Sequence, residues 1–306
     1  MFANQWQYNL IKVMSRLISL LPYRVVLRLG RVLGPLYYRL AARQRCRAIS
    51  QLQECLAVSL PEAEHIIRNF FIKLSQTFLE VLYMPALTPF RIKEFVAIEN
   101  RHYLEEAFRQ GKGVAVLSAH IGNWEWLGAA LAMDGFPVAS IIKPQPNEQH
   151  TRLLNEYRQM VGIENYSRGT SEVVGAAKAL KNGKVLGFFI DQDGGEIGTF
   201  VPFLGKMAST PMGAVVFAKR FRCPIVPAFI VRRPEGGHRI LIQPAFYYED
   251  TGDETRDMYN LTLKMTRIVE DVIRAYPDEW LWFQKRWNTS FEQSNLSKQG
   301  MVGETV

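Results

Sequence analysis

A histidine and a glutamate lie five positions apart in the segment VLSAHIGNWEW, directly after an apolar run. In one uninterrupted helix, His120 and Glu125 would point about 140° away from each other and would not meet. If His120 instead ends a strand, Gly122 permits a turn and Glu125 begins the next helix, the carboxylate can fold back toward the imidazole. A carboxylate that holds one ring nitrogen leaves the other free to take a proton from a hydroxyl. This spacing predicts a general base and its orienting partner.

The same residues also have a purely structural interpretation, with His120 as a hydrogen-bonded core histidine and Glu125 as a carboxylate at a helix N-terminus. A serine acyl-enzyme is disfavoured because Ser118 lacks the GxSxG context, so direct transfer from a bound acyl donor to a hydroxyl fits better. The helix start offers backbone N–H groups for a developing oxyanion. The other histidines show no ligand spacing, and we expect neither a metal nor a cofactor.

Strands and helices alternate around this pair. Short apolar runs predict strands at residues 113–119, 136–143, 184–190, 224–233 and 238–248. Helical spacing and glycine stops predict helices at 100–111, from about 123, at 151–162, 171–183, 211–221 and 258–276. The alternation predicts an α/β fold with a mixed, mostly parallel sheet covered by helices on both faces.

The chain divides by composition into three parts. A helical region at 1–84 precedes two prolines in YMPALTPF, an α/β domain is expected at 85–289, and a polar, flexible tail at 290–306. Three cysteines without metal spacing, in a chain of 306 residues, suggest free thiols in a reducing compartment.

The N-terminal region is strongly basic. No acidic residue precedes Glu54, whereas cations occur at Lys12, Arg16, Arg24, Arg28, Arg31, Arg39, Arg43, Arg45 and Arg47. The apolar run LISLLPY is far shorter than the roughly 20 residues needed to cross a bilayer. Leucines and aromatic residues interleaved with cations are typical of helices that lie on an anionic membrane surface, although an amphipathic core helix with a solvated basic face is the alternative.

The net charge of +8 indicates an acidic partner. Nucleic acid is disfavoured because the basic residues alternate with long aliphatic side chains and form no recognised nucleic-acid fold or stacking platform. An anionic membrane surface or an acidic carrier protein fits the pattern better.

The segment AHIGNWEW resembles the HX4(D/E) motif of the glycerolipid acyltransferase superfamily, in the form with Glu found in bacterial lipid A biosynthesis lauroyl/myristoyl acyltransferases. Three further segments match in the same order: GFFIDQDGG, then GTFVPFLGKMASTPMGAVVFAKR with CPIVPAFIVRR, and finally YPDEWLWFQKRWN. The resemblance covers nearly the full chain. It implies a glycerolipid acyltransferase fold and transfer of a fatty acyl chain from acyl carrier protein or acyl-CoA to a lipid A precursor, at the cytoplasmic face of the bacterial inner membrane.

The resemblance also implies roles for particular residues. His120 would be the general base and Glu125 its catalytic partner. Substrate contacts are expected from Asn123, Lys143, Arg168, Asp191, Asp193, Phe200, Pro202, Phe203 and Gly205. The aspartates also fit a turn at a strand end, and the two phenylalanines a Gly/Pro turn that packs aromatic rings into the core.

One departure from the family pattern concerns Lys143, which precedes Pro144 where the family usually has Arg-Pro. Lysine keeps the charge but loses the bidentate fork that matches a phosphate. A lysophospholipid or phosphatidylinositol mannoside acceptor therefore remains an alternative, as does a non-catalytic protein that binds membrane lipids.

Overall fold

The computed structural model describes residues 2–142, 147–167 and 170–291. Its helices are α1 (Phe2–Ser19), α2 (Tyr23–Leu40), α3 (Ala42–Leu56), α4 (Leu60–Tyr83), η1 (Met84–Ala86), α5 (Pro89–Phe95), α6 (Arg101–Arg109), α7 (Trp124–Met133), α8 (Glu148–Met160), α9 (Thr170–Lys181), α10 (Gly213–Phe221) and α11 (Glu254–Ala275). Its strands are β1 (Val96–Glu99), β2 (Val114–Ser118), β3 (Val138–Ile142), β4 (Glu164–Ser167), β5 (Val185–Phe189), β6 (Thr199–Phe203), β7 (Lys206–Thr210), β8 (Ile225–Arg232) and β9 (His238–Ile242).

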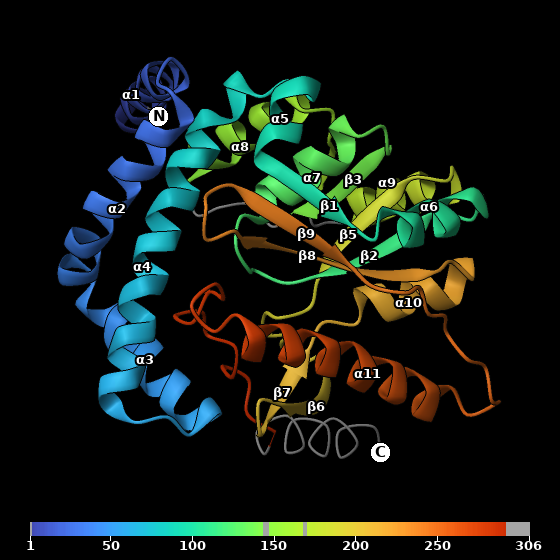
Figure 1. Ribbon diagram of the computed structural model, residues 1–306. Helices are drawn as coiled ribbons and strands as arrows, with labels where there is room; N and C mark the ends of the chain where they lie inside the picture. Colours follow the sequence, from blue (N-terminus) through green and yellow to red (C-terminus); the bar gives the residue numbers. More distant parts are fainter. Residues whose placement is uncertain (1, 143–146, 168–169, 292–306) are drawn as a thin grey trace.

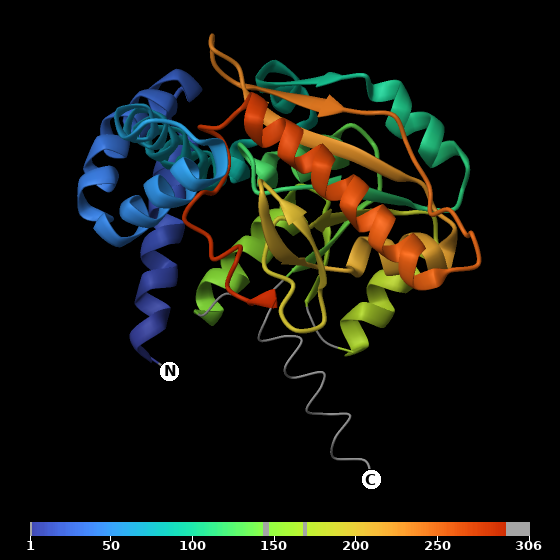
Figure 2. The ribbon, with the colours of Figure 1, turned by 90° about the horizontal axis from the view of Figure 1, so that it is seen from below.

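Seven strands form one sheet in the order β1-β9-β8-β2-β5-β3-β4, and β6 pairs with β7 in a separate hairpin. Within the large sheet only β8 and β9 are antiparallel. The predicted mixed, mostly parallel sheet is therefore confirmed. Figure 1 shows the sheet in the middle of the molecule, with α11 below it, and Figure 2 shows α11 crossing that side.

The two faces of the sheet bury two separate cores. Successive side chains of a strand point to opposite faces, so in β2 Ala115 and Leu117 join one core while Val114 and Val116 join the other. Helices α9, α10 and α11 contribute to the first core, and α5, α6, α7 and α8 to the second. Burial on both faces explains why the first four residues of β2, Val114 to Leu117, are all apolar.

Helices α1 to α4 stand together at one side of the sheet, and their buried residues join both cores (Figure 1). Helix α2 lies unusually close to α4 because Gly30 and Gly34 face it. A Cβ atom on Gly30 would lie 2.7 Å from Cα of Gln76, and one on Gly34 would lie 2.5 Å from Cα of Ile72. Among the described residues, no helix combines the length and apolar character needed to cross a bilayer.

Most elements predicted from the sequence are present, with shifted ends. The structure adds β1, β4, the short helix α5 and the hairpin β6–β7, which the sequence interpretation did not include. It also shortens the strand predicted at 238–248, which ends at Ile242 and leaves Phe246 in an isolated bridge to Ile225. Nearly all of the predicted tail at 290–306 lies outside the described residues.

Candidate active site

His120 and Asp191 occupy equivalent places at the ends of two neighbouring strands. In the parallel pair β2 and β5, Ser118 lies opposite Phe189, and each ionisable residue follows two positions later. The strand register thus brings the imidazole beside the carboxylate, and Nδ1 of His120 lies 2.9 Å from Oδ1 of Asp191. Because the carboxyl ends of parallel strands form one edge, this placement is typical of ligand sites in open α/β sheets.

Asp191 is almost fully buried and accepts several hydrogen bonds. Besides the imidazole, it accepts from the backbone N–H of His120 at 2.8 Å, from the Trp280 indole at 2.8 Å and from the Gln284 amide at 3.2 Å. Burial alone would raise its pKa, but the charge of His120 and the hydrogen bonds from His120 and Trp280 lower the pKa of Asp191 to about 2. Asp191 is therefore a carboxylate that only accepts hydrogen bonds.

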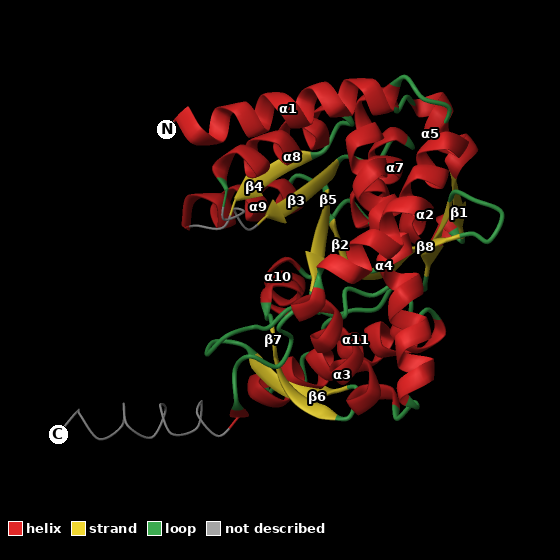
Figure 3. Ribbon diagram, turned by 90° about the vertical axis from the view of Figure 1, so that its left-hand side faces the viewer, coloured by secondary structure: helices red, strands yellow, loops and turns green. Residues whose placement is uncertain are grey.

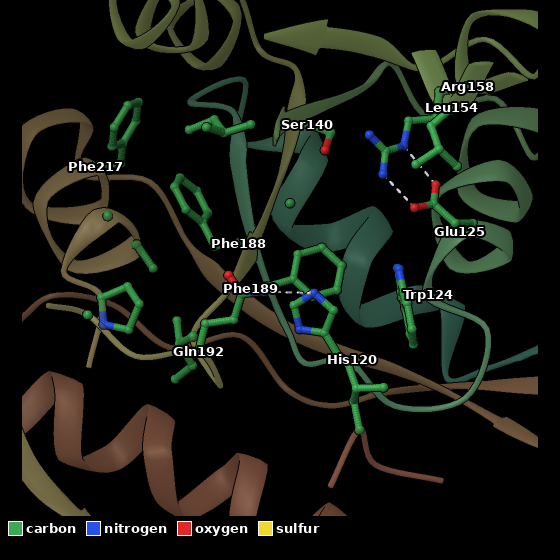
Figure 4. A pocket seen from close by; sticks show the side chains of 18 of the residues that line it. His120, Trp124, Glu125, Ser140, Leu154, Arg158, Phe188, Phe189, Gln192 and Phe217 are labelled. Atoms are coloured by element: carbon green, nitrogen blue, oxygen red, sulfur yellow. Dashed lines mark hydrogen bonds and ion pairs between the residues drawn. The ribbon is translucent and has the colours of Figure 1, made fainter. Parts of the chain in front are cut away.

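An ionised Asp191 fixes the tautomer of His120. Since Nδ1 must donate to the carboxylate, the neutral ring carries its lone pair on Nε2. The amide nitrogen of Gln192 lies 3.4 Å from Nε2, and both residues line a large cavity. The ring is packed between Trp124 and Phe189, with centroid distances of 5.1 and 4.9 Å (Figure 4). The arrangement presents a basic nitrogen to whatever occupies the cavity.

The expected contact between Glu125 and His120 is not formed, and this part of the prediction is wrong. Both carboxylate oxygens of Glu125 instead accept hydrogen bonds from the guanidinium of Arg158, at 2.5 and 2.7 Å (Figure 4). Helix α7 does begin directly after the turn, as predicted, but its first turn points Glu125 toward α8, which carries Arg158. Asp191, which arrives from the neighbouring strand, takes the place that the sequence interpretation gave to Glu125.

The turn between β2 and α7 is tightly held. Gly122 has a φ of +60°, and a Cβ atom there would lie 2.2 Å from the carbonyl oxygen of Ile230, so only glycine fits. Asn123 is the N-cap of α7, and its Oδ1 accepts from the N–H of Trp126 at 3.1 Å. Asn123 is fully buried and does not line the cavity among the described residues.

The cavity has a volume of about 1160 Å³ and a mostly apolar wall. His120, Trp124, Glu125 and Arg158 lie along one side, and the rest of the wall comes chiefly from α4, β5, α8 and α10. Figure 4 shows Phe188 and Phe217 facing the same space. A space of this size and character suits a long hydrocarbon chain better than a small polar substrate.

A smaller pocket of about 60 Å³ continues behind the Glu125 and Arg158 pair, and both residues line both spaces. Its wall is formed by buried side chains of β2, β3, β5 and α7, including Leu131. Gly128, one turn after Glu125, also lines it, and a Cβ atom there would lie 2.9 Å from Cδ1 of Ile163. The absence of a side chain at Gly128 therefore leaves part of this pocket open.

The remaining predicted substrate residues lie elsewhere. Phe200, Pro202, Phe203 and Gly205 belong to the hairpin β6–β7, which lies at the opposite end of the molecule from α1, and none of them is among the described residues that line the cavity (Figure 3). The hairpin turn uses positive φ angles at Leu204 and Gly205, as two-residue turns require. Their role in substrate binding stays a prediction.

Phe203 is a core residue in this structure. Its ring packs against Trp280 and Trp287 and lies 4.7 Å below the buried guanidinium of Arg286. Arg286 in turn donates to the backbone of Ser209 and to the hydroxyl of Thr210, so it holds β7 against the C-terminal segment.

Asp193 lies near this segment as well, and its carboxylate accepts from the N–H and hydroxyl of Thr289 at 3.2 and 2.8 Å. Lys143 and Arg168 lie outside the described residues. No cluster of three metal-binding side chains occurs in residues 2–142, 147–167 and 170–291.

Two important residues escaped the sequence interpretation. Arg158 lies in a polar helix whose composition is typical of surface helices. Its partner, Glu125, is visible only in the folded structure. Glu80 is a fully buried carboxylate on α4, inside a long amphipathic helix. A run of apolar residues on both sides of Glu80 was the one signal present in the sequence.

The chain was also compared with known proteins by sequence. Residues 2–289 match the model of the bacterial lipid A biosynthesis acyltransferase family. The chain is 26% identical to the lipid A biosynthesis palmitoleoyltransferase of Escherichia coli over 276 residues, which cover 88% of this chain and 87% of that protein. It is 24% identical to the lipid A biosynthesis lauroyltransferase of the same organism over 280 residues, or 89% and 88% of the two chains.

A further relative is the phosphatidylinositol mannoside acyltransferase of Mycolicibacterium smegmatis, 23% identical over 261 residues, or 82% of this chain and 83% of that protein. The family match spans nearly the whole chain and includes the strand ends that carry His120 and Asp191. This protein therefore belongs to the bacterial lipid A biosynthesis acyltransferase family and is an acyltransferase of lipid A biosynthesis.

Proposed function

We propose that this enzyme transfers a fatty acyl chain from a thioester, carried by acyl carrier protein or coenzyme A, to a hydroxyl of a lipid A precursor, with His120 as the general base. The observation that carries the proposal is the pair of His120 and Asp191 at the wall of a large apolar cavity. The pair supplies a base, and the cavity suits a hydrocarbon chain.

The chemistry follows from the tautomer of His120. Nε2 removes the proton of the acceptor hydroxyl while the oxygen attacks the thioester carbonyl, and the carboxylate of Asp191 stabilises the resulting imidazolium. The tetrahedral intermediate then breaks its C–S bond, and the leaving thiolate takes the proton from the imidazolium. One ester bond forms, one thioester bond breaks, and His120 returns to its neutral state.

Backbone N–H groups at the start of α7 are suited to hold the oxyanion. Within the described residues, the N–H groups of Trp124 and Glu125 have no hydrogen-bond partner, and both residues line the cavity beside His120. The partial positive charge of a helix N-terminus favours an anion there.

Glu125 acts in the site through its ion pair with Arg158, and not through contact with His120. The buried ion pair balances its own charges at the boundary between the large cavity and the inner pocket. The donor's acyl chain would pass this ion pair and end in the inner pocket beside Gly128.

We further propose that α1 and α2 lie on the anionic cytoplasmic face of the inner membrane. Exposed apolar side chains follow helical spacing on each helix, at Trp6, Leu10, Val13 and Leu17 on α1 and at Leu29, Leu33, Leu36 and Leu40 on α2. Exposed arginines accompany them, at Arg16, Arg24, Arg28, Arg31 and Arg39. Apolar stripes flanked by cations are the pattern of helices bound in a membrane interface.

The fixed position of α1 supports this orientation. Tyr8 and Lys12 bond to Glu156 on α8, so the opposite face of α1 points outward in a defined direction (Figure 3). To test the surface, Leu17→Glu and Leu33→Glu would be compared with Phe90→Glu, a control at an exposed residue of α5. We expect only the first two to weaken sedimentation with anionic vesicles. Equal sedimentation of all variants would contradict the membrane proposal.

The reaction is tested with labelled acyl carrier protein thioester and acyl-CoA, each offered with a Kdo-bearing lipid A precursor, lysophosphatidic acid or a phosphatidylinositol mannoside. The mannoside is included because a relative is named for it. We expect label on the lipid A precursor, and a fall of roughly 100-fold or more in His120→Ala. Label on another acceptor would show that the enzyme uses a different class of acceptor lipid. Full activity of His120→Ala would show that His120 is not the general base.

A further inference from the structure

A cluster of buried ionisable side chains lies outside the cavity wall and directly behind the α7 turn. At its centre is Glu80 of α4, whose side chain is fully buried. Its carboxylate accepts from the guanidinium of Arg232 at 2.7 and 2.9 Å, from the hydroxyl of Tyr23 at 2.6 Å and from the side-chain amide of Asn123 at 3.0 Å. His238 lies 3.1 Å from both carboxylate oxygens.

The cluster keeps Glu80 ionised. Burial alone would raise the pKa of this carboxyl, but the charges and hydrogen bonds of Arg232 and His238 lower it below its ordinary value. An ionised carboxylate can accept from all of these donors at once, whereas an amide would turn its own donor toward them. The position therefore favours a carboxylate over a neutral amide of the same shape.

Glu80 holds the first turn of α7 at two points. Its side chain bonds to Asn123, which caps the helix through the N–H of Trp126, and its backbone carbonyl accepts from the Trp126 indole at 3.0 Å. The same short turn carries the free N–H groups of Trp124 and Glu125 beside His120. Any rotation of this turn would move those donors relative to the reacting carbonyl.

We propose that Glu80 is a positioning residue that acts through Asn123 to aim the backbone N–H groups of Trp124 and Glu125 at the oxyanion of the reacting thioester. The inference rests on the proposed acyl transfer and on the oxyanion site at α7. Glu80 itself touches neither the cavity nor His120 among the described contacts. Donors aimed at a developing charge contribute only when their direction is fixed before the reaction.

The test compares two donors that differ in one atom, the thioester and its dithioester, in which sulfur replaces the carbonyl oxygen. Sulfur is larger and accepts hydrogen bonds weakly, so the wild type should favour the thioester beyond the intrinsic difference in reactivity. The quantity measured is the ratio of kcat/KM for the two donors. This ratio does not depend on the fraction of folded enzyme, so a loss of stability alone leaves it unchanged.

Two variants break the hydrogen bond between Glu80 and Asn123 in different ways. Glu80→Gln removes the carboxylate, while Asn123→Ser keeps a helix cap but loses the bond to Glu80. We expect both to lower the oxygen preference by roughly 10-fold or more, because one oxyanion donor is worth about 100-fold or more in rate. Tyr23→Phe removes a single bond to Glu80 and should lower the preference less.

Glu156→Gln is the matched control, because Glu156, like Glu80, accepts from a tyrosine and a cationic side chain but lies on α8 and does not line the cavity. Its ratio should equal that of the wild type. An unchanged ratio in Glu80→Gln or in Asn123→Ser, with reduced kcat or not, would overturn the positioning role. A wild type that transfers from no thioester would instead reject the proposed function on which the role depends.

Discussion

Nδ1 of His120 lies 2.9 Å from Oδ1 of Asp191, and the two residues stand at matching positions after neighbouring parallel strands. The backbone N–H of His120 donates to the other oxygen of the same carboxylate at 2.8 Å. One carboxylate therefore fixes both the main chain and the ring of the base. Preorganisation of this kind reduces the rearrangement that proton transfer requires.

The lowered pKa of Asp191 predicts how it contributes to stability. A carboxyl whose folded pKa of about 2 lies below the ordinary 3.8 stabilises the fold above pH 4 and loses this contribution as the pH falls toward 2. The free energy of unfolding of the wild type should exceed that of Asp191→Asn at pH 6, and the gap should narrow by pH 3. Urea unfolding of both proteins measures the gap, and a gap that stays constant would refute the assignment.

The ion pair of Glu125 and Arg158 predicts a strongly coupled pair of substitutions. Removing either partner leaves a buried charge, so Glu125→Leu and Arg158→Met should each lower the free energy of unfolding by about 3 to 5 kcal/mol. The double variant should be more stable than at least one single variant, because it leaves no unpaired charge.

The exposed pair Lys206 and Glu54 provides the control for this cycle. Substituting Lys206→Ala should change the free energy of unfolding by no more than about 1 kcal/mol. If the losses at Glu125 and Arg158 simply added in urea unfolding, the two residues would not act as one unit.

The inner pocket predicts a change in acyl-chain preference. Gly128→Leu would fill space beside Ile163, so the enzyme should prefer shorter donor chains than the wild type does. Leu131→Ala enlarges the same pocket and should shift the preference toward longer chains. Competition among thioesters of increasing length measures the preference.

Leu104→Ala removes an equally buried leucine on α6, outside both pockets, and should leave the chain-length preference as it is. If Gly128→Leu and Leu131→Ala moved the preference in the same direction, or not at all, the acyl chain would not end in this pocket.

Local patterns predicted much of the fold. The fully buried β2 and the helix that starts after Asn123 follow from an apolar run, a glycine turn and a capping residue, which are all neighbours in the sequence. The hairpin β6–β7 was missed because Pro202 and the surrounding Gly and Phe residues suggested a loop, although an edge strand tolerates proline.

The partner of His120 could not be predicted from local spacing. Strand β5 lies beside β2 although β3 and β4 separate them in the sequence, so the register that brings Asp191 to His120 is a property of the sheet order. The partners of Arg158 and Glu80 could not be predicted for the same reason. The partner of Arg158 lies 33 positions away in the sequence, and those of Glu80 lie 43 positions or more away. The spacing of residues along a helix does not show which charged side chains become buried against other elements.

The joint action of His120 and Asp191 is tested by comparing kcat for acyl transfer among the wild type, His120→Ala, Asp191→Asn and the double variant, each checked for folding by circular dichroism. If Asp191 acts by orienting and balancing the imidazole, Asp191→Asn should lose roughly 100-fold or more, and the double variant should be no slower than His120→Ala alone. Wild-type turnover in Asp191→Asn, or losses that multiply in the double variant, would show that the two residues do not work as one base.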